Sequence, residues 1–172
     1  PEQFLLDPQM EPLLLAGAPP DPFAEQGQLW GNPVYNWALM REDGHQYWVH
    51  RLKRALSLTP TLRLDHFRGL SAYWGVPPDA PDARHGQFYE GPGMAFFQDI
   101  RRALGDVNLV AEDLGVLDDG VYQLLEDSGL PGMRVLQFAF GAESINVHLP
   151  HQHKENSVVY TGTHDNPTTR HW

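Results

Sequence analysis

The sequence predicts a mixed α/β fold in which parallel strands alternate with helices, and two observations support this prediction. Short apolar runs typical of buried strands alternate with longer amphipathic stretches typical of helices. These segments also follow one another at regular intervals, as the strand–helix units of a parallel sheet do. The expected strands cover residues 61–65, 108–111, 133–140 and 157–161, and the expected helices cover 45–58, 94–104 and 118–127.

Capping signals mark several of the expected helix ends. Gly105 ends the helix at 94–104, and Ser128-Gly129 ends the helix that Asp118 or Asp119 caps. Asn32-Pro33 predicts the beginning of a further short helix that reaches about Met40. Asparagine is a good capping residue and proline is favoured at the first helical position.

The intervals between strand ends favour a barrel. A (β/α)8 barrel of about 250 residues devotes about 31 residues to each strand–helix unit. Glu112, Gln137 and Asp165 lie 25 and 28 positions apart, which suits one unit each. The 47 positions from Asp65 to Glu112 suit one unit plus a Pro/Gly-rich loop insertion at 75–93. The sequence therefore predicts about half of a (β/α)8 barrel, with a doubly wound open sheet as the alternative.

The length is that of one domain. A chain of 172 residues buries one core and is too short for two ordinary domains. We expect residues 1–172 to form a single partial barrel domain, with a loop-rich first segment at 1–31 where prolines are frequent. The chain begins with Pro1 and ends soon after a motif, so we expect it to be a piece of a longer protein.

Composition narrows the classes of partner. A formal net charge of −10 argues against nucleic acid, because phosphate binding needs a basic face, and a neutral substrate fits better. The absence of cysteine is compatible with the cytoplasm, which is the expected location. No apolar run approaches the roughly 18–20 residues of a membrane span, so a membrane is not an expected partner.

Three acidic residues fall where the expected strands end. They are Asp65, Glu112 and Asp165. In parallel α/β folds the carboxyl ends of the strands form the active face, so these side chains are candidates for acid/base or nucleophilic roles. Any one of them alone could simply cap the following helix. Three together favour glycosyl transfer, because a retaining mechanism uses a nucleophilic carboxylate and an acid/base carboxyl, and a third carboxylate can stabilise the transition state.

Two neighbours of these carboxylates have expected orientations. Arg63 lies two residues before Asp65, so on a strand both side chains share one face. A guanidinium there would keep Asp65 ionised, as a nucleophile requires, although an ordinary salt bridge is the alternative interpretation. Asp113 should point away from Glu112, and we interpret it as structural support.

Five short motifs resemble those of the amylomaltases, the 4-α-glucanotransferases of glycoside hydrolase family 77. They are GQLWGNP at 27–33, RLDHFRG at 63–69, AEDLG at 111–115, GLPGMRVLQF at 129–138 and GTHDN at 162–166. The motifs run in order over nearly the whole chain, and the five together are far more specific than any one. The resemblance implies that the chain covers roughly strands 4 to 7 of a (β/α)8 barrel.

The resemblance also implies roles for individual residues. Asp65 would be the nucleophile, Glu112 the acid/base and Asp165 the transition-state stabiliser. Arg63 and His164 would contact the sugar on the donor side, and Trp30 would lie near the acceptor. Further candidates for substrate contacts are Asn32, His66 and Phe23.

The implied partners are α-1,4-glucans, namely maltodextrins and amylose, with glucose as an acceptor. Neither a metal nor another cofactor is implied. The chain departs from the family at residues 20–23, where a proline stands in place of a usual tyrosine. Phe23 could still cover the acceptor, or it could pack locally.

Three alternatives remain open from the sequence. An α-glucan hydrolase of the amylase superfamily could use the same three carboxylates. A metal-dependent barrel hydrolase could use Asp65-His66 and His164-Asp165 as ligands, although Arg63 on the same face would repel a cation. The chain could also be an inactive piece of an enzyme that binds glucan or serves only a structural role.

Overall fold

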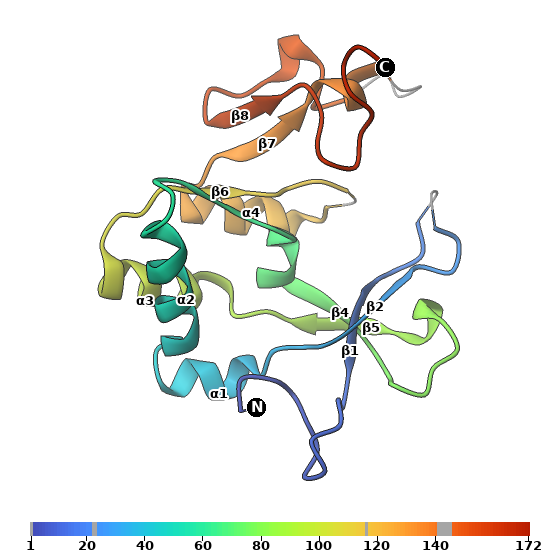
Figure 1. Ribbon diagram of the computed structural model, residues 1–172, viewed down its shortest axis with the longest axis vertical. Helices are drawn as coiled ribbons and strands as arrows, with labels where there is room; N and C mark the ends of the chain where they lie inside the picture. The colour runs from blue at the N-terminus through green and yellow to red at the C-terminus, as the bar shows by residue number, and fades with distance from the viewer. Residues whose placement is uncertain (1, 22–23, 116, 141–145) are drawn as a thin grey trace.

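The computed structural model describes residues 2–21, 24–115, 117–140 and 146–172 of the chain (Figure 1). It contains parallel strands covered by helices. A separate antiparallel sheet lies at the lower right of Figure 1. The α/β class predicted from the sequence is therefore confirmed. No helix within the described ranges is long and apolar enough to span a bilayer.

Two parallel strand pairs form the part of the fold that carries the catalytic candidates. Strand β3 (Leu62–Leu64) pairs with β6 (Leu109–Ala111), and β7 (Gly132–Val135) pairs with β8 (Ser157–Tyr160). The Ala111 N–H donates to the Pro131 carbonyl at 2.8 Å, which links β6 to the segment that leads into β7. The strand ends at residues 65, 112 and 136 thus follow one another across neighbouring strands.

Helices cover one side of β3 and β6. They are α1 (Trp37–Glu42), α2 (Gln46–Leu56), α3 (Gly93–Leu104) and α4 (Asp119–Ser128). Leu64 of β3 and Ala111 of β6 share a buried cluster with Leu52 of α2, Phe96 of α3 and Val121 of α4. Burial of these side chains is the main favourable term that fixes the strands beneath the site.

The antiparallel sheet has the order β2-β1-β4-β5. Its strands are β1 (Leu15–Ala18), β2 (Gln28–Pro33), β4 (Ala72–Val76) and β5 (Gln87–Glu90). Much of this sheet comes from 1–31 and 75–93, which the sequence predicted to be loop. Gly17 lets β1 approach β2 closely, because a Cβ there would overlap the carbonyl oxygen of Gln28.

Two further predictions were wrong. Asn32-Pro33 closes strand β2, and α1 begins at Trp37 with Asn36 as its cap, whose Oδ1 accepts the Leu39 N–H at 3.2 Å. The expected strand at 133–140 ends at Val135, and Leu136–Phe140 forms the 3₁₀ helix η3. The other 3₁₀ helices are η1 (Phe67–Leu70), η2 (Ala83–His85) and η4 (Pro150–Gln152).

Candidate active site

Asp65 and Arg63 lie together at the end of β3. Arg63 Nη2 is 2.5 Å from Asp65 Oδ1, so the two side chains share one face of the strand as predicted. The Asp65 side chain is 76% exposed and the Arg63 side chain 32%. Asp65 is therefore an accessible carboxylate with a cation beside it.

Glu112 follows β6 and is half-buried. Its Oε2 accepts the His66 N–H at 2.7 Å, and its Oε1 accepts the Leu114 N–H at 3.1 Å. Burial raises the pKa of the Glu112 carboxyl above its ordinary value, and the nearby Asp65 carboxylate acts in the same direction. The two backbone donors and Arg63 oppose this shift without cancelling it. The surroundings of Glu112 thus favour its neutral form more than water would.

His66 connects these two residues. Its backbone has a positive φ of 51°, and this conformation turns its N–H toward Glu112. Its ring stands edge-on to Trp30 of β2, with ring centroids 4.8 Å apart. Burial and the nearby Arg68 lower the pKa of the imidazole, which favours the neutral ring. His66 therefore contacts β2 with its side chain and holds Glu112 with its main chain.

A cleft of about 520 Å³ opens at this position. Five of the residues predicted for the site line it, namely Trp30, Asn32, Arg63, Asp65 and His66. The structure thus brings residues from β2 and from the end of β3 to one cavity. Glu112 lies next to the cleft through its hydrogen bond to His66.

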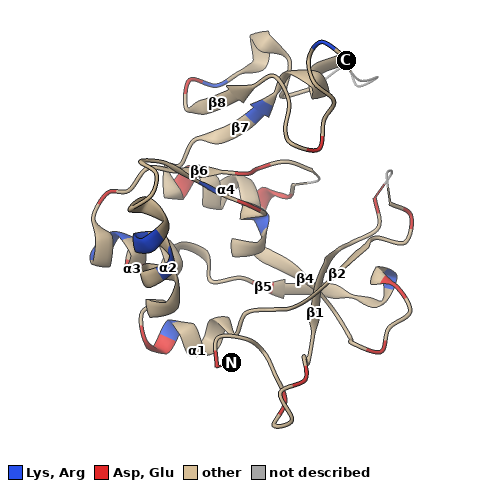
Figure 2. Cartoon of the chain, in the orientation of Figure 1, with Lys and Arg blue, Asp and Glu red and all other residues tan. Residues whose placement is uncertain are grey.

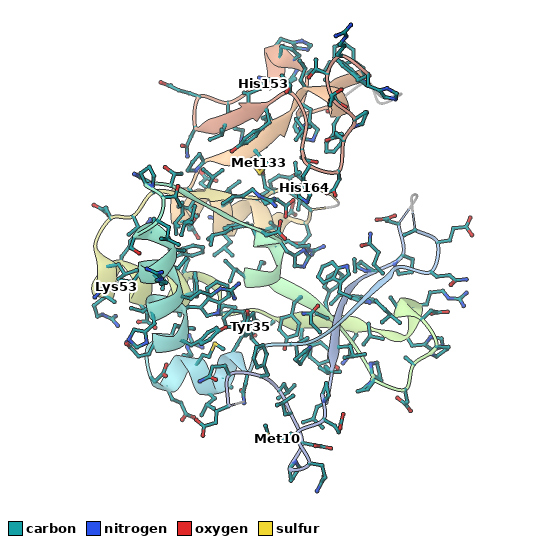
Figure 3. The ribbon with its side chains drawn as sticks, viewed as in Figure 1. Met10, Tyr35, Lys53, Met133, His153 and His164 are labelled. Carbon is teal, nitrogen blue, oxygen red and sulfur yellow. The ribbon has the colours of Figure 1, made fainter. Side chains whose placement is uncertain are left out.

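The sequence analysis missed Tyr35 and Arg51, which line the same cleft. Arg51 Nη1 donates to Tyr35 Oη at 2.7 Å, and its guanidinium lies 4.8 Å from the Trp48 ring centroid. Figure 3 shows Tyr35 between the helices and the antiparallel sheet. An arginine on an amphipathic helix looks like an ordinary solvated residue, so the sequence carried no signal for this contact.

Asp165 and His164 lie on the loop that follows β8. His164 Nε2 is 3.4 Å from Asp165 Oδ2, and the two side chains are 76% and 81% exposed. Figure 3 shows His164 on a loop that runs from β8 back toward the level of β6. Within the described part of the chain, no ion pair or hydrogen bond joins either residue to Asp65 or Glu112. Their predicted roles therefore stay predictions.

Phe23, the remaining candidate for a substrate contact, lies outside the described residues. Within the described ranges, no group of three or more His, Asp and Glu side chains is arranged to hold a metal ion. Basic residues gather on α2 and α3 (Figure 2).

The pair formed by Asp65 and Glu112 defines a class of site. One carboxylate is exposed and paired with a guanidinium, and its neighbour on the adjacent strand has a raised pKa. Retaining enzymes that cleave glycosidic bonds use such a pair of carboxyl groups, one as nucleophile and one as acid.

Comparison with known proteins identifies the family. The family model for 4-alpha-glucanotransferases matches residues 1–172, so the chain belongs to the 4-alpha-glucanotransferase family. The resemblance found in the five motifs is thereby confirmed.

Individual relatives agree with this assignment. The chain is 50% identical over 171 residues to the chloroplastic/amyloplastic 4-alpha-glucanotransferase of Solanum tuberosum, covering 99% of this chain and 30% of the relative. It is 46% identical over 173 residues to the 4-alpha-glucanotransferase of Clostridium butyricum, covering 100% of this chain and 36% of the relative.

A solved structure is similar as well. The amylomaltase from Streptococcus agalactiae in complex with acarbose matches with a TM-score of 0.92 and 41% identity. The match covers 96% of this chain and 34% of that one. The chain thus spans about a third of the length of the relatives that it matches.

Proposed function

We propose that the protein carrying this chain transfers α-1,4-glucan segments between maltodextrins by a retaining double displacement. The observation that carries the proposal is Glu112, a carboxyl with a raised pKa that is held by two N–H groups beside the Arg63-paired Asp65. Membership of the 4-alpha-glucanotransferase family supports the same reaction.

Each carboxyl group has one task in this mechanism. Asp65 attacks the anomeric carbon, and Glu112 gives its proton to the departing glucan oxygen, leaving a glycosyl–Asp65 ester. Glu112, now ionised, takes the proton from an acceptor hydroxyl as that oxygen attacks the anomeric carbon, which breaks the bond to Asp65 and releases its carboxylate. Asp165 would stabilise the positive charge of both transition states.

The remaining candidates bind the substrate in this proposal. Arg63 and His164 contact the donor sugar, while Trp30, Asn32 and His66 lie toward the acceptor. The substrates are maltodextrins and amylose, with glucose as an acceptor. An amylomaltase of similar structure was solved with acarbose, which agrees with a site for chains of sugars.

The fold proposal is equally specific. We propose that β3, β6, β7 and β8 are barrel strands 4, 5, 6 and 7, so that the three carboxyl groups follow strands 4, 5 and 7. The parallel pairing of β3 with β6 and of β7 with β8 supports this order. A cytoplasmic location remains a prediction.

Product analysis on maltotriose tests the function with the full-length protein. We expect longer maltodextrins plus glucose, with no net rise in reducing ends. A rise of one reducing end per cleaved bond would indicate the hydrolase instead.

Two substitutions test the carboxyl roles. Glu112→Gln should lower kcat/KM about 10²–10⁴-fold, the usual contribution of a general acid, and Asp65→Asn should abolish transfer because no ester can form. Asp119→Asn, an exposed carboxylate on α4, is the matched control. Unchanged activity in Asp65→Asn or Glu112→Gln would refute the assignment.

A further inference from the structure

Asp113 is a buried carboxylate that the proposed reaction does not use. The residue is 5% exposed, and its side chain points away from Glu112 toward β7, as predicted. Its Oδ1 accepts the Met133 N–H at 2.5 Å, and its Oδ2 accepts from Arg134 Nη1 at 2.8 Å. The Arg134 side chain is only 8% exposed, so both charges of this ion pair are removed from water.

A buried ion pair of this kind is weak support for stability in itself. Desolvation of the two charges offsets much of their attraction. Arg134 Nε also has no hydrogen-bond partner among the described residues, which adds to the cost. The net stabilisation from the pair is therefore small, and its position in the fold indicates a second role.

The pair lies just beyond the end of β6. Strand β6 has only three residues, and the ladder bond that links it to the β7 side is made by Ala111. The main chain of Glu112 bonds in the opposite direction, because its N–H donates to Leu64 and its carbonyl accepts from Phe67. Beyond Ala111, the Asp113 side chain takes over the link to β7. Glu112 is thus held between β3 on one side and β7 on the other.

Strand β7, to which Asp113 bonds, is itself held in place by several contacts. It pairs with β8 over its whole length, and the Val135 N–H donates to His148 Nδ1 at 3.1 Å. Burial lowers the pKa of His148 and so favours the neutral imidazole, the form that can accept this bond. Gly132 completes the arrangement, because a Cβ there would overlap Asp113 Oδ2.

We propose that Asp113, paired with Arg134, is a positioning residue that fixes Glu112 for its acid/base step. This inference rests on the proposed function. Asp113 touches no substrate: it sets the backbone of the residue that does. A shift of about 1 Å in a catalytic group can lower a rate about 10²-fold.

Leaving-group dependence tests the proposal with the full-length protein. Asp113→Asn keeps the shape and one acceptor but removes the charge that Arg134 requires. We expect its kcat/KM for maltotriose to fall about 100-fold. With α-maltosyl fluoride the fall should be much smaller, because fluoride leaves without a proton from Glu112. A purely structural defect would lower both rates equally, and that result, or two unchanged rates, would overturn the proposal.

Gly132→Ala covers the case in which Asp113→Asn does not fold. The added methyl group displaces the Asp113 carboxylate without a change of charge. We expect Gly132→Ala to react much more slowly with maltotriose but only slightly more slowly with α-maltosyl fluoride. Its far-ultraviolet circular dichroism spectrum should stay unaltered. Equal rates of Gly132→Ala and the unsubstituted protein on maltotriose would overturn the inference.

The proposed function is judged by different variants. It fails if the unsubstituted protein performs no transfer, or if Glu112→Gln reacts equally slowly with both donors. The inference about Asp113 can fail while the proposed function holds. This happens when Glu112→Gln loses much more activity on maltotriose than on α-maltosyl fluoride, but Asp113→Asn does not. Asp119→Asn again serves as the exposed carboxylate control.

Discussion

Two effects shift the pKa of the Glu112 carboxyl in opposite directions. Burial favours the neutral acid, whereas the N–H groups of His66 and Leu114 favour the carboxylate, and burial prevails. A general acid works best when its pKa is near the pH of the reaction. The half-buried position of Glu112 therefore suits it to give a proton away and then to take one back.

The pH dependence of kcat/KM follows from this raised pKa. In the proposed mechanism Glu112 carries its proton when the donor is cleaved, so we expect activity to fall as pH rises through the pKa of Glu112. We expect the alkaline limb for maltotriose to lie above the ordinary value of 4.5. α-Maltosyl fluoride, which needs no proton, is the control and should show no such limb in kcat/KM. A limb at or below 4.5, or one shared by both donors, would contradict the assignment.

The proposed acceptor contact of Trp30 can be tested separately from the chemical step. The residue is 42% exposed, and its ring stands edge-on to His66 at the cleft. Loss of an aromatic contact worth about 0.5–1.5 kcal/mol should raise the KM for glucose up to about tenfold in Trp30→Ala. The KM for the donor should change less, and Trp30→Phe should retain most of the binding. Equal effects on donor and acceptor would place Trp30 elsewhere in the cleft.

At the scale of elements, an ion pair joins the segment after β3 to α4. Arg68 of η1 contacts Asp118 at 2.7 Å, and Asp118 also caps α4 by accepting the Val121 N–H at 3.1 Å. The Arg68 guanidinium lies 4.5 Å from the ring centroid of Phe88 on β5. The Asp118 carboxylate therefore caps α4 and also connects α4 to the segment that follows β3.

Two substitutions at Asp118 separate these contributions. Asp118→Asn keeps the cap and loses the charge, so we expect a cost of at most about 1 kcal/mol, because the Asp118 side chain is 57% exposed. Asp118→Ala also removes the cap, which should cost about 1 kcal/mol more. Urea unfolding of the full-length protein measures both. Equal stability of the two variants would show that the cap contributes nothing.

The sequence predicted the elements whose signals are local. Apolar runs marked β3 and β6, and Gly105 and Gly129 marked helix ends. The antiparallel sheet was missed because β1 and β4 each contain a glycine and β2 is exposed along most of its length. Such strands lack the alternation of apolar and polar residues that identifies a strand in sequence.

The same limit applied to the candidate site. Arg63 and Asp65 could be placed together because strand geometry fixes residues two positions apart. The bond from His66 to Glu112 could not be predicted, since it depends on a left-handed backbone at a non-glycine residue and on strand pairing. Likewise, the η3 turn interrupts an apolar run that reads as one continuous strand.

At the scale of the whole molecule, the two parallel pairs present open edges. Within the described residues, β3 pairs only with β6 and β8 only with β7. Val159 of β8 is 51% exposed. Parallel sheets are normally covered on both faces, and a closed barrel leaves no strand edge unpaired. Residues 1–172 thus expose surfaces that a longer chain could cover.

Residues 1–172 produced alone should therefore self-associate and perform no transfer. Unpaired strand edges invite pairing with another chain, and a charge on the edge suppresses it. We expect oligomers in sedimentation analysis, reduced by Val159→Lys. Leu58→Lys, at an exposed site after α2, is the matched control and should leave association unchanged. A folded monomer with transfer activity would contradict this prediction.

The main-chain bond from His66 to Glu112 has a practical consequence for engineering. Because His66, the residue after Asp65, donates its N–H to the Glu112 carboxylate, we expect the segments at 63–69 and 111–115 to depend on each other. A chimera that takes only one of these segments from a relative combines a donor loop and an acceptor loop from different proteins. The two loop shapes then need not match. Libraries that recombine these enzymes should keep both segments from the same parent.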